Sequence, residues 1–576
     1  MRFRRLLHFD RADFVLLLHF FGAFFESDLL AIRDQLATIF ASVAGLLASF
    51  GLIVPVLFNH KYRVLNALPT PALYNEAALA DKLMFICLCM NFTAIATLLN
   101  WQSLFPDRRD FLVLIPLPLE RLQLFRAKLV ALLLFVSLLI ASVNVLPSLS
   151  MTAVMSGRWQ PGNGILQITS FFVACCLAGY FVFFTLLAIQ AILLNVLPSV
   201  WFADCSLLMQ GVLLVLACAA LPLTLWIPEL HSWIAAEPPL LRWLPPAWFL
   251  GLEQSMLGIS DSAMRQLAHQ AWWWLCVAVT LSLLLYVLTY ARNTDQLLKS
   301  PVTTQSRFAG RYLSRILNMA IRVPEERAVV SFAVKSLCRS RVHKLVVAGI
   351  MGAALALVLD AFVSLLIDQT LYHRVVGPYA VRSAVCSAPL IVAYFLSSGL
   401  LFVFSIPLEL QANWIFRLSE VQGRYWPIAA AEKIFLAVIV APVSAIALAF
   451  LAIWMGFGAA FLQAVFVLLM CLVLMEGLLW NWSRIPFTCP YLPGRRNIIQ
   501  SALLFGVLLS VFAYVATNIE LRLSNSLFGM AILFAALTTI FLFMQVQRRR
   551  SWSGGLCVRF DEQLQGEVQT LELGGE

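Results

Sequence analysis

The chain contains twelve runs of about twenty mostly apolar residues, and these runs limit what it can fold into. A helix of roughly 20 residues crosses a hydrocarbon layer, and in lipid only helices and closed barrels satisfy their own backbone hydrogen bonds. Hydrophobic residues make up 61% of the chain and charged residues only 12%, which excludes an ordinary water-soluble globular protein. The sequence therefore predicts an all-α, polytopic membrane protein.

The predicted spans form two groups of six, separated by a long basic segment in the middle of the chain. This arrangement is typical of a duplicated six-helix unit, which is common in transporters. The fourth run is longer than one crossing needs, so it is expected to tilt or to extend beyond the membrane. The spans are residues 37–58, 83–105, 129–149, 165–197, 205–227 and 271–290 in the first half, and 345–367, 387–406, 434–454, 459–479, 498–517 and 527–546 in the second.

Positive charge lies almost wholly on one side of these spans. If the N-terminus is cytoplasmic and the sides alternate, 31 of the 40 Lys and Arg residues face the cytoplasm. This bias follows the positive-inside rule, so we expect twelve spans with both termini in the cytoplasm, in the cell inner or plasma membrane. Contact with the lipid bilayer explains the net charge of +10, and no nucleic-acid partner is expected.

The same reading divides the chain into five parts. An apolar stretch flanked by arginines precedes the first span and is too short to cross, so it is expected to lie along the inner surface as a helix. The predicted parts are this interfacial helix at 1–36, the first six-span unit at 37–290, a basic cytoplasmic linker at 291–344, the second six-span unit at 345–546, and a cytoplasmic tail at 547–576.

The cytoplasmic connection between the second and third spans has a similar pattern in both halves. It covers residues 106–128 in the first half and residues 407–433 in the second, and each begins with Pro and ends with Lys. In the first half, apolar residues at helical spacing stand on both sides of Pro116 and Pro118, which break helices. We expect a helix, a turn and a second helix at the inner surface.

An external connection of about 40 residues precedes the sixth span of the first half, whereas the second half has only a turn there. Its segment 243–252 contains aromatic residues and two consecutive prolines, a composition that suits an interfacial or re-entrant element. The residues expected to close the outer end of a pathway are Trp243, Pro245, Pro246, Trp248 and Phe249.

Few residues in the chain suggest chemistry. No Gly-Lys pair exists, so the chain lacks the phosphate-binding P-loop of an ATPase, and its dispersed histidines predict no metal site. No catalytic residue is predicted. Asp360 and Glu476 are the ionisable residues expected inside the membrane, either paired for structural reasons or coupled to an ion. Glu76 and Asp81, expected in the first outer loop, are the acids that an enzyme would use.

The interfacial N-terminal helix, the six-span units and the helical connections ending in Lys resemble the permease subunits of ABC-2-type exporters. The chain departs from that family in joining two units and in lacking the outer element in its second half. The residues that carry the resemblance are Asp107, Arg108, Arg109, Pro116, Pro118 and Lys128, and, in a more diverged form, Glu409, Trp414, Arg417 and Lys433.

The resemblance implies a transport subunit rather than an enzyme. Its coupling residues would contact two separate ABC ATPase subunits, which bind the ATP, and the chain itself would hold no cofactor. The substrate would be hydrophobic or amphipathic, because the spans contain few polar residues. Two alternatives stay open: an ion-coupled secondary transporter of the major-facilitator type, and a membrane-embedded lipid-linked sugar transferase.

Overall fold

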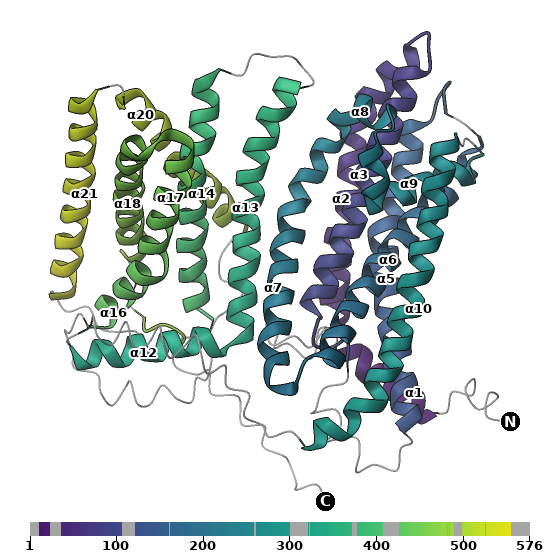
Figure 1. The fold of residues 1–576 in the computed structure, drawn as a ribbon, viewed down its shortest axis with the longest axis horizontal. Helices are drawn as coiled ribbons and strands as arrows, with labels where there is room; N and C mark the ends of the chain where they lie inside the picture. The colour runs from purple at the N-terminus through teal and green to yellow at the C-terminus, as the bar shows by residue number, and fades with distance from the viewer. Residues whose placement is uncertain are drawn as a thin grey trace, which may run out of the picture. The chain divides into compact units, whose positions relative to one another are not determined.

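The structure is a computed structural model, and it divides into two compact units, Met1–Thr304 and Gln305–Glu576. Every regular element among the described residues is a helix, which confirms the predicted all-α class (Figure 1). The described residues are 11–23, 36–105, 121–160, 162–258, 261–299, 321, 323–370, 377–406, 426–480, 482, 484–488, 498–524 and 526–553.

The first unit consists of long helices and, before its last helix, a set of short ones. The short helices form most of the connection of about 40 residues that was predicted to be external and to precede the sixth span. The elements are α1 (Arg11–Ala23), α2 (Leu36–Ala67), α3 (Ala72–Leu99), α5 (Arg121–Met155), α6 (Gly164–Val196), α7 (Ser199–Leu223), η3 (Thr224–Leu230), α8 (His231–Ala235), η4 (Pro239–Trp243), α9 (Pro245–Met256) and α10 (Ser262–Lys299).

In the second unit, two of the long helices are interrupted by a π-helical turn, η6 and η7. A tight turn at Gly456 joins α17 to α18, and its φ of 81° lies in the left-handed region that glycine adopts without strain. The elements are α12 (Pro324–Arg339), α13 (Arg341–Thr370), α14 (Pro378–Phe404), α16 (Trp426–Phe435), η6 (Leu436–Val440), α17 (Ala441–Met455), α18 (Phe457–Leu479), α19 (Ile498–Leu509), η7 (Ser510–Val515), α20 (Ala516–Leu523) and α21 (Leu527–Ser553).

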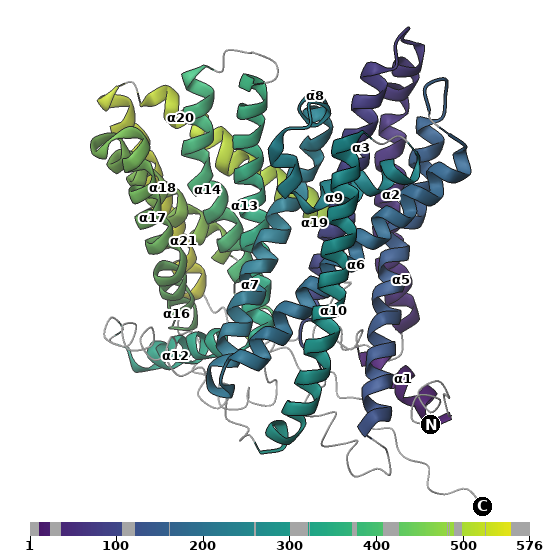
Figure 2. The ribbon, with the colours of Figure 1, turned by 45° about the vertical axis from the view of Figure 1, so that its right-hand side comes forward.

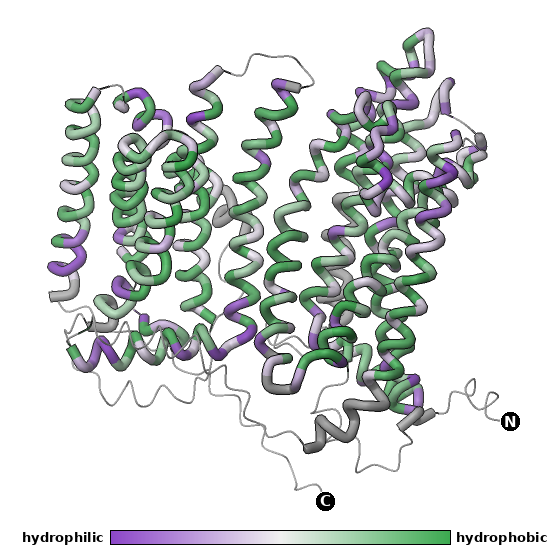
Figure 3. Tube along the Cα trace, viewed as in Figure 1, coloured by the Kyte–Doolittle hydropathy of each residue, from purple (hydrophilic) through white to green (hydrophobic). Residues whose placement is uncertain are grey.

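Eleven helices in the described part of the chain are long and apolar enough to cross a membrane. They coincide with the second to twelfth predicted spans, and hydrophobic residues cover most of their length (Figure 3). The protein is therefore a multi-pass membrane protein. α2 contains the first predicted span, but the side chains of residues 36–50 lie outside the described set, so a twelfth crossing stays a prediction.

The second span begins earlier than predicted. The sequence placed it at 83–105, after the charges of Asp81 and Lys82, whereas α3 begins at Ala72 and ends at Leu99. The helix continues through these charges because both side chains are buried and each has an oppositely charged partner. Glu76 and Asp81 thus belong to a helix and not to an outer loop.

Part of the predicted basic linker also has a regular structure. Its residues 324–339 form α12, which lies across the ends of the spans of the second unit (Figures 1 and 2). The apolar face of α12 contributes Val329, Val330, Ala333 and Val334 to the core of that unit. The linker was predicted from its charges alone, and the apolar stripe at helical spacing is what packs α12 against the spans.

Candidate functional site

Most of the predicted coupling residues lie outside the described part of the chain. Asp107, Arg108, Arg109, Pro116 and Pro118 fall in residues 106–120, and Glu409, Trp414 and Arg417 fall in residues 407–425. The two described members are Lys128 and Lys433. Both stand near the start of the third span of their unit, on α5 and on α16 respectively.

Lys128 lies where α1 packs against α5. Its side chain is buried, and its Nζ lies 4.7 Å from the centroid of the Phe20 ring of α1, within the range of a cation–π contact. Two residues earlier, Arg126 Nη2 lies 3.4 Å from the buried Asp13 Oδ2, also on α1. A short helix before the first span is thus fixed to the start of the third.

Lys433 makes the corresponding contact in the second unit. Its Nζ forms an ion pair with Glu326 of α12, which is the helix that precedes the first span of this unit. In each unit, therefore, an acid on the helix before the first span pairs with a base at the start of the third span. We call α1 and α12, with these ion pairs, the inner anchors, because they stand at the end predicted to face the cytoplasm.

The predicted outer gate residues separate into buried and exposed members. Trp243 is 81% exposed, and Pro245 and Pro246 begin α9, where proline is well tolerated because the first helical N–H groups have no intrahelical partner. Trp248 and Phe249 are buried, and Trp248 stacks on Trp274 of α10 with 6.0 Å between ring centroids. The segment is thus a short helix packed into the first unit.

α9 also carries a buried charge that the sequence analysis missed. Lys82 Nζ of α3 lies 2.6 Å from Glu253 Oε1 of α9 and donates a second hydrogen bond to Gln167 Oε1 of α6, at 3.2 Å. Gln254 Nε2 donates to the other oxygen of Glu253, at 2.7 Å. The Glu253 side chain has no exposed surface, and that of Lys82 is 7% exposed.

Asp81, the residue before Lys82, pairs with side chains of α2 and not of α9. Lys61 Nζ lies 2.8 and 2.9 Å from the two carboxylate oxygens of Asp81, and Tyr62 Oη donates to one of them at 2.7 Å. Glu76 Oε2 lies 3.3 Å from His231 Nδ1. The acids considered for an enzyme are therefore engaged by other side chains. The signal that the sequence offered for Lys82 and Glu253 was a charged residue inside an apolar helix. It could not show that the two residues pair, because they are 171 residues apart.

The two predicted intramembrane acids have different surroundings. Asp360 is half-buried on α13, whereas Glu476 of α18 is fully buried. Arg548 Nη2 of α21 lies 2.8 Å from Glu476 Oε2 and 3.0 Å from Glu476 Oε1. The same nitrogen forms an ion pair with Glu432 of α16. One guanidinium thus links the third, fourth and sixth spans of the second unit. Neither Glu432 nor Arg548 was singled out from the sequence.

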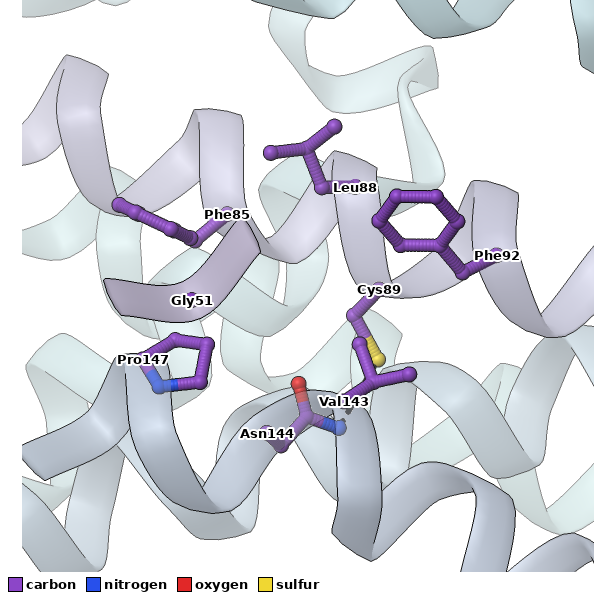
Figure 4. Close-up of a pocket in the computed structure, with 8 residues that line it drawn as sticks. All are labelled: Gly51, Phe85, Leu88, Cys89, Phe92, Val143, Asn144 and Pro147. Atoms are coloured by element: carbon purple, nitrogen blue, oxygen red, sulfur yellow. Dashed lines mark hydrogen bonds between the residues drawn. The ribbon is translucent and has the colours of Figure 1, made fainter. Parts of the chain in front are cut away.

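A small hollow lies among α2, α3 and α5 (Figure 4). In its lining, Asn144 Nδ2 donates a hydrogen bond of 3.1 Å to Cys89 Sγ. Among the described residues, no group of three or more His, Cys, Asp or Glu side chains is placed to hold a metal ion. The lining residues of the hollow are Gly51, Phe85, Leu88, Cys89, Phe92, Val143, Asn144 and Pro147.

No family model, no curated protein and no solved structure matches this chain.

Proposed function

We propose that the protein is the membrane-spanning transport subunit of an ABC-type exporter in the cell inner or plasma membrane. It moves a hydrophobic or amphipathic substrate, and two separate ATPase subunits hydrolyse the ATP. The observation that supports this proposal best is the pair of inner anchors. Arg126, which pairs with Asp13, and Lys433, which pairs with Glu326, stand at the ends of the two connections that resemble ATPase-coupling elements.

The physical argument is one of force transmission. A partner that pushes on a connection moves the span that follows it only if the junction is stiff. In each unit the start of the third span is braced by an ion pair and by apolar packing against a second helix. Coupling then consists of a difference in binding free energy between two arrangements of the spans, and the partner ATPases supply this difference.

Purification with associated proteins tests the proposal. The tagged chain is isolated from its native membrane in mild detergent, and the eluate is assayed by mass spectrometry and for ATP hydrolysis. We expect a stoichiometric P-loop partner and vanadate-sensitive hydrolysis. A chain that purifies alone, without hydrolysis, would contradict the proposal.

Charge reversal then tests the coupling residues. The double variant Arg108→Glu, Arg109→Glu should lose stimulation of the bound ATPase while its spans still insert. A matched control reverses the same charge at the predicted outer side, through Arg158→Glu and Arg265→Glu, and should leave stimulation unchanged. Equal stimulation in both double variants would count against the assignment.

A second function is favoured by the buried charges in the second unit. Ionisable residues within membrane spans often take part in ion coupling, and Glu476 shares Arg548 with Glu432. In an ion-coupled secondary transporter, the purified chain alone would carry protons into vesicles containing a pH-sensitive dye. The Glu476→Gln variant would lose this flux, and in the exporter no such flux exists.

A further inference from the structure

The Lys82–Glu253 ion pair joins α9 to α3, and its surroundings distinguish it from a surface contact. Both side chains are almost fully removed from solvent, and amide side chains of Gln167 and Gln254 complete the hydrogen bonding. A buried ion pair contributes little compared with apolar residues of similar size, but separating its partners is very unfavourable. Such a pair therefore opposes movement of α9 away from α3.

Asp81 and Lys82, which are neighbours on α3, pair with two different helices. Asp81 is held by Lys61 and Tyr62 of α2, and Lys82 is held by Glu253 of α9. α3 is therefore fixed to α2 independently of its link to α9. Movement of α9 away from α3 would break the Lys82–Glu253 pair and leave the Asp81 contacts intact.

The rest of α9 packs tightly against α10. A Cβ atom added at Gly251 would lie 2.5 Å from Leu267 Cβ and 2.7 Å from Met264 O, so the backbones of α9 and α10 touch closely there. Figure 2 shows α9 beside α10. On either side of α9 the backbone has a positive φ, 49° at Glu237 and 74° at Gly258, which are points where the chain changes direction.

We propose that the Lys82–Glu253 pair is the latch of an outer gate formed by α9, and that opening the gate requires this pair to separate. The inference rests on the proposed transport function and deepens it. Lys82 and Glu253 are positioning residues, because they act by holding α9 and the aromatic residues Trp248 and Phe249 that it carries. While the pair is intact, these rings stay packed in the first unit.

Trypsin cleavage at the arginines flanking α9 tests the latch. Arg242 and Arg265 are exposed on either side of α9, and Arg158 is exposed in the turn between α5 and α6, at the same end of the unit. The full chain is probed in sealed membrane vesicles of both orientations, and the rate of cleavage at each site is measured. Arg158 is the internal control for general unfolding.

Breaking the pair should open the gate locally. In Glu253→Gln and in Lys82→Met, we expect cleavage at Arg242 and Arg265 to accelerate roughly tenfold, with the rate at Arg158 unchanged, because only α9 loses its link to α3. The swapped double variant Lys82→Glu, Glu253→Lys should restore slow cleavage. Parallel acceleration at all three arginines, or no acceleration at any, would overturn the proposal.

An apolar replacement separates a latch from a merely structural pair. The double variant Lys82→Met, Glu253→Leu should fold and keep α9 closed, since apolar residues can replace a buried ion pair without loss of stability. Stimulation of ATP hydrolysis by the partner ATPase should fall at least fivefold, because no ion pair remains whose separation can open the gate. Normal stimulation in this variant would overturn the latch. If no ATPase partner exists, the proposed function fails, and the protease comparison still decides whether the pair controls α9.

Discussion

Buried charges join residues that are distant in sequence, and they are the points at which single substitutions should have the largest effects. Arg548 is 1% exposed and lies between two carboxylates, Glu432 and Glu476. A charge in a membrane protein is tolerated when it is paired and faces the protein interior. Removing one partner leaves the remaining charge without compensation, which costs more than the pair contributed.

The substitution Arg548→Ala should therefore destabilise the protein by about 3–5 kcal/mol, because it leaves two buried carboxylates without their shared guanidinium. Thermal unfolding of the purified protein in detergent measures the change. The neighbouring Arg549 is exposed, so Arg549→Ala is the matched control and should have a small effect. Equal melting temperatures for the two variants would show that Arg548 is not a central contact.

A second prediction concerns the close approach of α2 and α5. A Cβ atom at Gly51 would lie 2.4 Å from Pro147 Cδ, whereas one at Gly349 of α13 meets no atom within 4 Å. Gly51→Ala should destabilise the protein by about 1–3 kcal/mol through overpacking. Gly349→Ala should be neutral or slightly stabilising, since alanine favours a helix. The same unfolding measurement compares them, and a neutral Gly51→Ala would contradict the observed packing.

At the scale of elements, the inner anchors are equivalent parts of the two units. α1 and α12 both precede a first span, and each carries an acid, Asp13 or Glu326, that pairs with a base at the start of a third span. Two short helices with the same connections in both units support an origin by duplication. In the proposed function, this common position means that both third spans are moved in the same way.

If the protein is the proposed transport subunit, neutralising either anchor should weaken its coupling to the ATPase by a similar amount. In Asp13→Asn and in Glu326→Gln, the stimulation of ATP hydrolysis on the partner ATPase should fall several-fold, corresponding to a loss of about 1–2 kcal/mol of coupling free energy. The control is Glu325→Gln, which removes an exposed acid from the same helix α12. The swapped variant Asp13→Arg, Arg126→Asp should recover stimulation. A defect in one anchor but not in the other would argue against equivalent roles.

At the scale of the whole molecule, the chain consists of two compact units that meet at Thr304 and Gln305 in the sequence. Each unit has a core of its own made from its own helices. A unit whose contacts are internal should keep its structure when it is expressed without the other. The division therefore predicts where the chain tolerates interruption.

Residues 1–304 expressed alone should insert into the membrane and unfold in one cooperative transition. A fragment that ends at residue 160, between α5 and α6, should be degraded, because it lacks the α6, α7 and α9 partners of α3. Yield in the membrane fraction and thermal unfolding in detergent measure both outcomes. Equal stability of the two fragments would mean that the first unit is not a cooperative whole.

The sequence predicted the positions of the long helices well but not the residues that join them. Hydropathy located the eleven long apolar helices, yet it began the second span only after Asp81 and Lys82 because an isolated charge is unfavourable in lipid. It also treated residues 324–339 as linker, because their basic neighbours concealed a short apolar stripe. Of the candidate site, it found Trp248, Phe249, Lys128, Lys433 and Glu476, without any of their partners.

The sequence by itself determined the class of the protein and the run of its helices. A helix in lipid satisfies its backbone hydrogen bonds within one segment, so the signal for each span is local and can be found in about twenty consecutive residues. Tertiary structure decided which charges meet. Lys82 and Glu253, 171 residues apart, form a pair only because packing brings α3 and α9 together, and such packing depends on the whole unit rather than on any one segment.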